Sequence, residues 1–179
     1  MKLTHEVYFS DTKDNFTNSR EALKHLLQNE GHEILELKST LELVNFGNLK
    51  NFPQYLTSIS HTKGAGAALL AHKSDYLSVG IDIEWSDRPM KDGTQKFYQN
   101  PQDSEYPNSL ELWAMKEAAF KALSPLGYPG VLVLSKIIIQ NGIFWSDERT
   151  ELRGSVQVQV HEQTAVGKKL NVAIAYISH

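Results

Sequence analysis

Residues 79–85, which read VGIDIEW, constrain the fold more than any other stretch of this chain. Successive side chains of a β-strand point to opposite faces, so a strand here places two isoleucines on one face and Asp82 and Glu84 on the other. The apolar residues before and between the two acids indicate a central strand, which does not usually carry two acids without a partner for them. Two carboxylates on one face repel each other unless a cation or a hydrogen-bond donor lies between them. We therefore expect a charged group to bind at this face.

A second informative stretch, residues 110–123, has the periodicity of an amphipathic helix. At roughly 100° per residue its apolar positions form one face, and Glu117 and Lys121 lie nearly opposite, one helical turn apart. If the helix packs with Glu117 toward the strand, the carboxylates of Asp82, Glu84 and Glu117 lie close to the ammonium group of Lys121. Oxygen ligands with open positions suit Mg²⁺ that keeps water and a substrate phosphate, and the lysine suits the remaining phosphate charge. The pattern thus indicates Asp82, Glu84 and Glu117 as candidate metal ligands.

Both features also have simpler interpretations. Asp82 and Glu84 could form the solvated face of an edge strand, where acids are common. Lys116 and Glu117 could be an ordinary exposed pair of charges on a helix. The apolar character of the residues just before Asp82 favours the buried strand, and with it the metal site.

The segment Ser60-His61-Thr62 is a second candidate site. Adjacent side chains of a strand point apart, so Ser60 and His61 do not form a nucleophile and base by local geometry. A serine hydrolase would need a distant base, an acid and an oxyanion hole. Phosphate binding is the interpretation we favour, because hydroxyls, backbone amides and a protonated imidazole all favour an anion. A turn with a partly buried histidine is the third alternative.

The composition limits the classes of protein that remain. Hydrophobic residues make up 41% of the 179 residues and charged residues 22%, which suits a packed core and does not indicate disorder. The net charge of −3 argues against a general nucleic-acid binder, and the absence of cysteine excludes disulfides and thiolate metal sites. The first residues lack the apolar region of a signal peptide, and no apolar run has transmembrane length. We therefore expect a cytoplasmic protein without a membrane partner.

The order of the predicted elements indicates an α+β fold of two similar halves that meet near residue 79. Helices are expected at residues 17–28, capped by Thr17 or Ser19, and at residues 110–123, capped by Ser109. Asn141-Gly142 predicts a hairpin, and the polar segment 86–108 predicts a surface flap with one short helix near residues 96–98. Strands are expected at residues 5–10, 34–37, 41–46, 55–60, 65–71, 78–84, 131–134, 136–140, 143–146, 156–160 and 170–177.

The acidic strand and the helix together resemble the 4′-phosphopantetheinyl transferases. The strand of that family has the pattern G-[IV]-D-x-E, found here at residues 80–84, and its helix has W-x-x-K-E-A-x-x-K, found here at residues 113–121. In the larger, surfactin-synthetase-activating branch a segment S-[LI]-S-H-[ST] precedes the acidic strand, and residues 58–62 (SISHT) stand in that place. Further upstream, Arg20 near a helix start, and Lys50 in a loop with Pro53, are similar to basic positions of the branch.

The resemblance implies a pseudo-dimer of two α+β halves, residues 1–79 and 80–179, that binds coenzyme A in the cleft between them and acts as a monomer. It implies transfer of the 4′-phosphopantetheine arm to a serine of an acyl or peptidyl carrier protein, with release of 3′,5′-ADP. Asp82, Glu84 and Glu117 would hold Mg²⁺. Glu117, or a water that it holds, would take the proton of the serine, and Lys121 would stabilise the pyrophosphate. Coenzyme A would be bound by Lys121 together with Ser60, His61, Arg20 and Lys50.

The chain departs from the family pattern in three places. The N-terminal half is short, the connection between Glu84 and Trp113 is short, and Ala114 replaces a hydroxyl residue that often follows the tryptophan. The first two differences affect substrate affinity and the choice of carrier. They leave open a second class of function, a non-catalytic relative that binds coenzyme A or a carrier without transferring anything.

Overall fold

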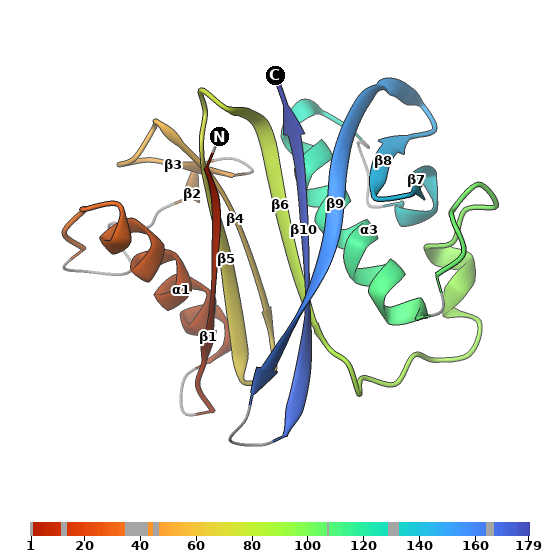
Figure 1. The fold of residues 1–179 in the computed structure, drawn as a ribbon, viewed down its shortest axis with the longest axis horizontal. Helices are drawn as coiled ribbons and strands as arrows, with labels where there is room; N and C mark the ends of the chain where they lie inside the picture. Colours follow the sequence, from red (N-terminus) through yellow and green to blue (C-terminus); the bar gives the residue numbers. More distant parts are fainter. Residues whose placement is uncertain are drawn as a thin grey trace.

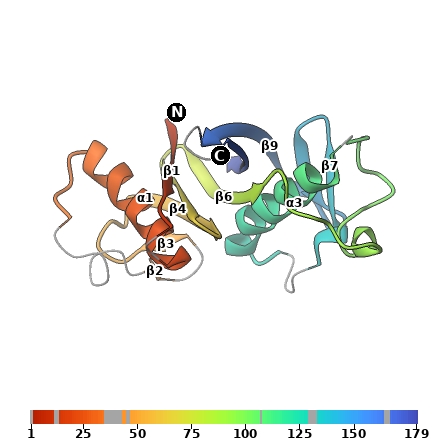
Figure 2. The ribbon, with the colours of Figure 1, turned by 90° about the horizontal axis from the view of Figure 1, so that it is seen from below.

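The computed structural model describes residues 2–11, 14–34, 43–44, 47–106, 108–128, 133–163 and 167–179. Within these ranges the chain forms two antiparallel β-sheets and two α-helices. The sheets pack against each other in the middle of the molecule, and the helices lie on its two sides (Figure 1, Figure 2). The predicted α+β fold class is therefore confirmed.

The first sheet contains residues between 3 and 72 and has the strand order β1-β5-β4-β3-β2. The hairpin of β4 and β5 turns at Lys63 and Gly64, where the sequence predicts a sharp turn, and Gly64 adopts a positive φ of 76°. The strands are β1 (Leu3–Phe9), β2 (Leu43–Val44), β3 (Asn48–Leu49), β4 (Tyr55–Thr62) and β5 (Ala65–His72).

Helix α1 (Asn15–Asn29) covers the outer face of this first sheet, and Gly66 of β5 allows its close approach. A Cβ atom at Gly66 would lie 2.1 Å from the backbone nitrogen of Ser19. The helix starts earlier than predicted because Asp14 is its N-cap, and the Asp14 carboxylate accepts both the backbone amide and the hydroxyl of Thr17. Thr17 and Ser19 are thus helical residues, not caps. The apolar stripe of α1 packs on β4 and β5 through Ala22, Leu23, Leu26 and Leu27.

The second sheet contains residues between 76 and 178 and has the order β6-β10-β9-β8-β7. The hairpin predicted at Asn141-Gly142 joins β7 and β8, and both residues have positive φ, 50° and 76°. Whether the two sheets are separate halves in the sense of residues 1–79 and 80–179 stays a prediction. The strands are β6 (Tyr76–Trp85), β7 (Ile137–Gln140), β8 (Ile143–Ser146), β9 (Arg149–Gln163) and β10 (Lys168–Ser178).

Helix α3 (Ser109–Leu123) packs on the second sheet, on the face that points away from the first. Its N-cap is Asn108, whose side chain accepts the amide of Leu110 at 3.0 Å, so Ser109 is the first helical residue and the predicted cap is wrong by one position. A Cβ atom at Gly80 of β6 would lie 2.0 Å from the carbonyl oxygen of Ala118. This close approach places one side of α3 directly against the acidic face of β6.

The core between the two sheets is continuous and apolar. Alternate residues of β6 enter it, and on the other side it is formed by β1, β4 and β5. Because the isoleucines of β6 face this core, the acids between them face α3, as the alternation of the sequence predicts. The fully buried members contributed by β6 and β10 are Val79, Ile81, Ile83, Leu170, Val172 and Ile174.

Several predicted boundaries differ from the structure. Strand β9 is about three times as long as the predicted 156–160, because its outer residues are polar and its length is set by pairing with β10. Leu134, predicted to end a strand, begins the short 3₁₀ helix η3 (Leu134–Lys136). The flap contains η1 (Thr94–Phe97) near the predicted short helix, and η2 (Ser124–Leu126) follows α3. The predicted strands 34–37, 41–46 and 131–134 lie largely outside the described residues.

Candidate functional site

The two acids of β6 are buried. Asp82 and Glu84 are each 6% exposed. Strand β6 is an edge strand of the second sheet, so the expectation of a central strand is wrong. The strand is nevertheless buried, because β4 of the other sheet packs against it and α3 covers its acidic face. The interpretation of these acids as a solvated edge face is therefore wrong as well.

The free edge of β6 is closed by side chains instead of another strand. The amide of Ile81 donates to Ser58 Oγ at 3.1 Å, and Lys121 Nζ donates to the carbonyl oxygen of Ile81 at 2.9 Å. Buried backbone groups without partners are costly, so these two contacts fix β4, β6 and α3 relative to one another. They bring the acidic strand, the SISHT segment and the helix to one point.

Asp82 lies at the centre of this polar cluster. Its Oδ1 accepts hydrogen bonds from Lys121 Nζ at 2.9 Å and from Ser60 Oγ at 2.8 Å. Its Oδ2 is buried and has no hydrogen-bond partner. Because a buried carboxylate oxygen without a donor destabilises the fold, a cation or a donor from a ligand would be bound favourably at this atom.

Glu84 and Glu117 share the electrostatic environment of Asp82. Burial, and then the charge of Asp82, raise the pKa of Glu84 to about 7, although Arg88 contacts its carboxylate and opposes the shift. Burial and Asp82 also raise the pKa of Glu117, against the charges of Lys121 and Arg88. The three predicted carboxylates are thus close enough to repel one another, and the two cations compensate only part of that repulsion.

The donor chemistry of the cluster fits a hard divalent cation. It offers carboxylate oxygens, one of them buried without a partner, and a mutual repulsion that a cation would relieve. The side chains are not arranged as a closed metal centre, however. In the part of the chain that the structure describes, no group of three or more His, Cys, Asp or Glu residues is placed to hold one ion. Arg88 and Lys121 instead contact the carboxylates of Glu84 and Asp82.

Asn171 belongs to this cluster, although no motif of the sequence identifies it. It lies on β10 directly opposite Glu84 in the antiparallel register and is 2% exposed. Directly opposed residues have Cβ atoms about 4.5–5.5 Å apart and share a face of the sheet. The Nδ2 of Asn171 is buried and has no hydrogen-bond partner. The only sequence signal is one amide within the otherwise apolar run LNVAIAYI of residues 170–177.

A groove of about 190 Å³ has Lys121 in its wall and lies between α3 and β4. One side is formed by Phe120 and Ser124 near the end of α3, and the other by Thr57 and Ile59 of β4 with Gly47 before β3. Its walls are mostly apolar, and Lys121 supplies a cation next to Asp82. The groove therefore suits an apolar part of a ligand that has an anionic group near Lys121.

The structure places Ser60 and His61 on opposite faces of β4. Ser60 is buried and donates its hydroxyl proton to Asp82, whereas His61 is exposed. The Ser60 hydroxyl is thus bound to a carboxylate and not to an imidazole, which does not favour a serine hydrolase. Ser60 joins the acidic cluster directly, and phosphate binding by Ser60 and His61 stays a prediction.

Arg20 and Lys50 lie in the first half, on α1 and after β3. The guanidinium carbon of Arg20 lies 3.1 Å from the centre of the Phe16 ring, and its Nη1 is buried without a hydrogen-bond partner. Burial lowers the pKa of Arg20. Lys50 is exposed. The predicted role of both residues toward coenzyme A stays a prediction.

Lys116 is the largest departure from the sequence analysis at this helix. It is completely buried, so its interpretation as part of an exposed charge pair is wrong. Its Nζ donates to Asp103 at 2.8 Å and contacts the carbonyl oxygen of Ile137. Asp103 also accepts the amides of Asn100 and Ile139. This ion pair therefore fastens the flap to α3 and β7.

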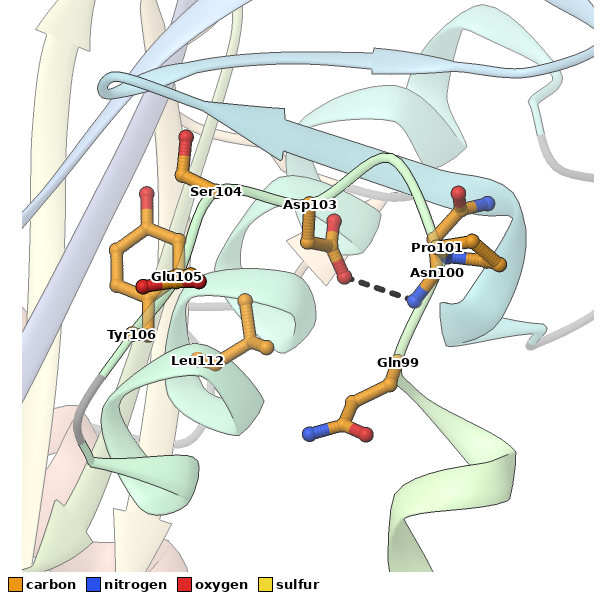
Figure 3. A pocket seen from close by; sticks show the side chains of 8 residues that line it. All are labelled: Gln99, Asn100, Pro101, Asp103, Ser104, Glu105, Tyr106 and Leu112. Atoms are coloured by element: carbon orange, nitrogen blue, oxygen red, sulfur yellow. Dashed lines mark hydrogen bonds between the residues drawn. The ribbon is translucent and has the colours of Figure 1, made fainter.

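A hollow of about 720 Å³ is lined by the same part of the flap and by Leu112 of α3 (Figure 3). The Asp103 carboxylate on its wall is already saturated by its amide and ammonium donors. None of the described residues that line this hollow has a buried side-chain atom without a hydrogen-bond partner, in contrast to Asp82. We therefore place the candidate functional site at Asp82, Glu84, Glu117 and Lys121.

No protein-family model matches this chain, and no curated protein matches it significantly. No helix in the described ranges is both long and apolar enough to cross a membrane.

Proposed function

We propose that the protein is a Mg²⁺-dependent 4′-phosphopantetheinyl transferase with a pseudo-dimeric fold. It would move the arm of coenzyme A to a serine of an acyl or peptidyl carrier protein. The observation that carries the proposal is the contact of Lys121 with Asp82, whose second oxygen is buried without a partner, in the electrostatic vicinity of Glu84 and Glu117. The two motifs lie 39 residues apart at their Lys121–Asp82 contact, so their meeting does not follow from either motif alone.

The reaction joins the serine oxygen of the carrier to the phosphorus of the pantetheine phosphate and breaks the bond from that phosphorus to the leaving 3′,5′-ADP. Asp82, Glu84 and Glu117 would hold Mg²⁺, which when bound neutralises charge on the pyrophosphate. Glu117, or a water that it holds, would accept the proton of the serine.

Lys121 would bind the pyrophosphate in exchange for part of its contact with Asp82. Charge-assisted contacts of this kind are short and about twice as strong as neutral hydrogen bonds. The groove that has Lys121 in its wall would accept part of coenzyme A, with the apolar walls of Phe120 and Ile59 against its uncharged portion. His61, Arg20 and Lys50 would contribute to its other phosphates and its nucleotide.

The direct test mixes the protein with coenzyme A, Mg²⁺ and a panel of apo acyl and peptidyl carrier proteins. Intact mass spectrometry of each carrier would reveal the added arm. We expect Glu117→Gln and Lys121→Met to abolish the mass shift while their circular dichroism spectra stay unchanged. Glu111→Gln, on the same helix but in contact with Asn108 at its start, is the matched control and should remain active. Full activity of Glu117→Gln would contradict the assigned role.

A non-catalytic relative that binds coenzyme A or a carrier remains the alternative. The observation that supports this alternative is the short flap, which the ion pair of Lys116 and Asp103 holds against the body of the protein. The same experiment separates the two functions. If calorimetry detects coenzyme A binding that Lys121→Met weakens, and no carrier in the panel gains mass, binding without transfer is the function.

A further inference from the structure

Two histidines from different sheets meet at the rim of the central core. His5 belongs to β1, on the same face as Val7, which packs into the core between the sheets. His161 belongs to β9 and stands opposite Leu170, another member of that core. In Figure 1 β9 crosses in front of β10 toward the first sheet. Both rings are half-buried, and each is held on a regular strand.

The two rings approach through the nitrogens that bind metals. Nε2 of His5 lies 3.2 Å from Nε2 of His161, with the rings at 83° and their centres 5.3 Å apart. At this distance two imidazolium groups would point protons at each other, so at least one ring is neutral. A metal ion binds the neutral imidazole, through either of its ring nitrogens.

The separation of the nitrogens matches the spacing of two ligands around one metal ion. With metal–nitrogen bonds of about 2.0–2.1 Å, two corners of a tetrahedron are about 3.3 Å apart. The observed 3.2 Å, a hydrogen-bond distance, is thus close to the separation that two ligands of one ion need. Imidazole suits zinc, copper and nickel, whereas Mg²⁺ prefers oxygen ligands, so this pair and the acidic cluster select different ions.

We propose that His5 and His161 form a two-imidazole site for a divalent transition-metal ion, distinct from the acidic cluster around Asp82. Within the described ranges no third histidine, cysteine or carboxylate completes a group around the pair, so water would fill the remaining positions. Glu6 is next in sequence to His5, but it lies near His25, 3.7 Å away. Because each sheet supplies one ligand, a bound ion would join the two sheets at this rim and stabilise the folded state.

The test is calorimetric titration of tag-free protein with Zn²⁺, in millimolar Mg²⁺ so that hard oxygen sites are already filled. We expect one bound equivalent of Zn²⁺ in the unaltered protein. Saturable binding should be lost in both His5→Ala and His161→Ala. His179→Ala, which removes an exposed histidine bound to the carbonyl oxygen of Lys73, should bind Zn²⁺ like the unaltered protein. Circular dichroism and thermal unfolding with EDTA establish that each variant is folded.

A second measurement needs no variant. Electron paramagnetic resonance of the unaltered protein with one equivalent of Cu²⁺ should show coupling to two imidazole nitrogens. Absence of saturable Zn²⁺ binding, binding that survives either single substitution, or a copper spectrum with fewer than two coupled nitrogens would overturn the proposal. None of these outcomes depends on transfer activity, so the proposal stands or falls separately from the proposed function.

Discussion

Replacing Gly80 with alanine should force α3 away from β6. A Cβ atom at this position would lie 2.0 Å from the carbonyl oxygen of Ala118 and 2.8 Å from the backbone nitrogen of Ala122. Both are backbone atoms of a helix, so neither can rotate away as a side chain would. Ordinary contacts of a Cβ atom begin near 3.4 Å. The helix and the strand must therefore separate by more than 1 Å, roughly the difference between a well-packed and a disrupted interface.

The magnitude follows from the kind of clash. Overpacking a core typically costs about 1–3 kcal/mol, and a backbone clash lies at the upper end because the structure can relax only by moving a whole element. We expect Gly80→Ala to lose about 3 kcal/mol of unfolding free energy. The same movement lengthens the contacts of Lys121 with Asp82 and with the carbonyl oxygen of Ile81, now both 2.9 Å. Loss of stability should therefore be accompanied by weaker binding at the acidic cluster.

Two glycines provide matched controls for urea denaturation. Gly66→Ala should lose a similar amount, because its Cβ atom would meet the backbone of α1 at 2.1 Å, at the other helix–sheet interface. Gly93→Ala meets nothing within 4 Å and has φ of +76°, so it should lose only about 1 kcal/mol from backbone strain. Coenzyme A affinity should fall in Gly80→Ala and stay unchanged in Gly93→Ala. If Gly80→Ala were as stable as Gly93→Ala, the packing argument for this helix would be refuted.

Three further predictions concern charges and amides. The pKa of Glu84 in the folded state is about 7, above the ordinary 4.5. Without divalent cations the folded state therefore binds this proton more tightly than the unfolded state does. Unfolding free energy should fall as pH rises from about 4.5 to about 7, and the slope in urea melts should shrink in Glu84→Gln. Lys116→Ala leaves the Asp103 carboxylate buried without its cation, so urea melts should show a loss of about 3–5 kcal/mol of unfolding free energy. Loss of an exposed lysine ion pair would lower the unfolding free energy by less than about 1 kcal/mol. Asn171→Leu removes a buried amide nitrogen, Nδ2, that has no hydrogen-bond partner. Calorimetry should therefore show equal or greater stability of the variant but weaker coenzyme A binding. A loss of stability would mean that the nitrogen has a partner in the folded protein.

The sequence predicted the elements of the site because their signals are local. The alternation around Asp82 fixes which side chains share a face, and the helical period of residues 110–123 fixes Glu117 and Lys121 one turn apart. Asn141-Gly142 predicts its hairpin for the same reason, since only two residues set the turn. These predictions need no knowledge of which strands become neighbours.

What the sequence could not predict depends on contacts between distant segments. The position of β6 at the end of its sheet, and the sealing of that edge by Ser58 and Lys121, require two sheets to be packed together first. Lys116 has the pattern of a surface residue, and only the return of Asp103 from the flap makes its burial tolerable. Asn171 becomes part of the site through the register of β10 on β6, which no spacing along the chain reveals.

The comparison of two buried carboxylates gives the strongest physical argument for a ligand at the proposed site. Asp103 is saturated: one oxygen accepts the amide of Ile139, the other accepts the amide of Asn100, and Lys116 lies 2.8 Å away. Asp82 is just as buried, yet Oδ1 accepts both of its hydrogen bonds and Oδ2 accepts none. The same fold can therefore satisfy a buried carboxylate completely, so the unsatisfied oxygen of Asp82 is not a general failure of packing. A buried carboxylate oxygen without a partner destabilises the folded protein, and a ligand that supplies the missing partner would remove that cost.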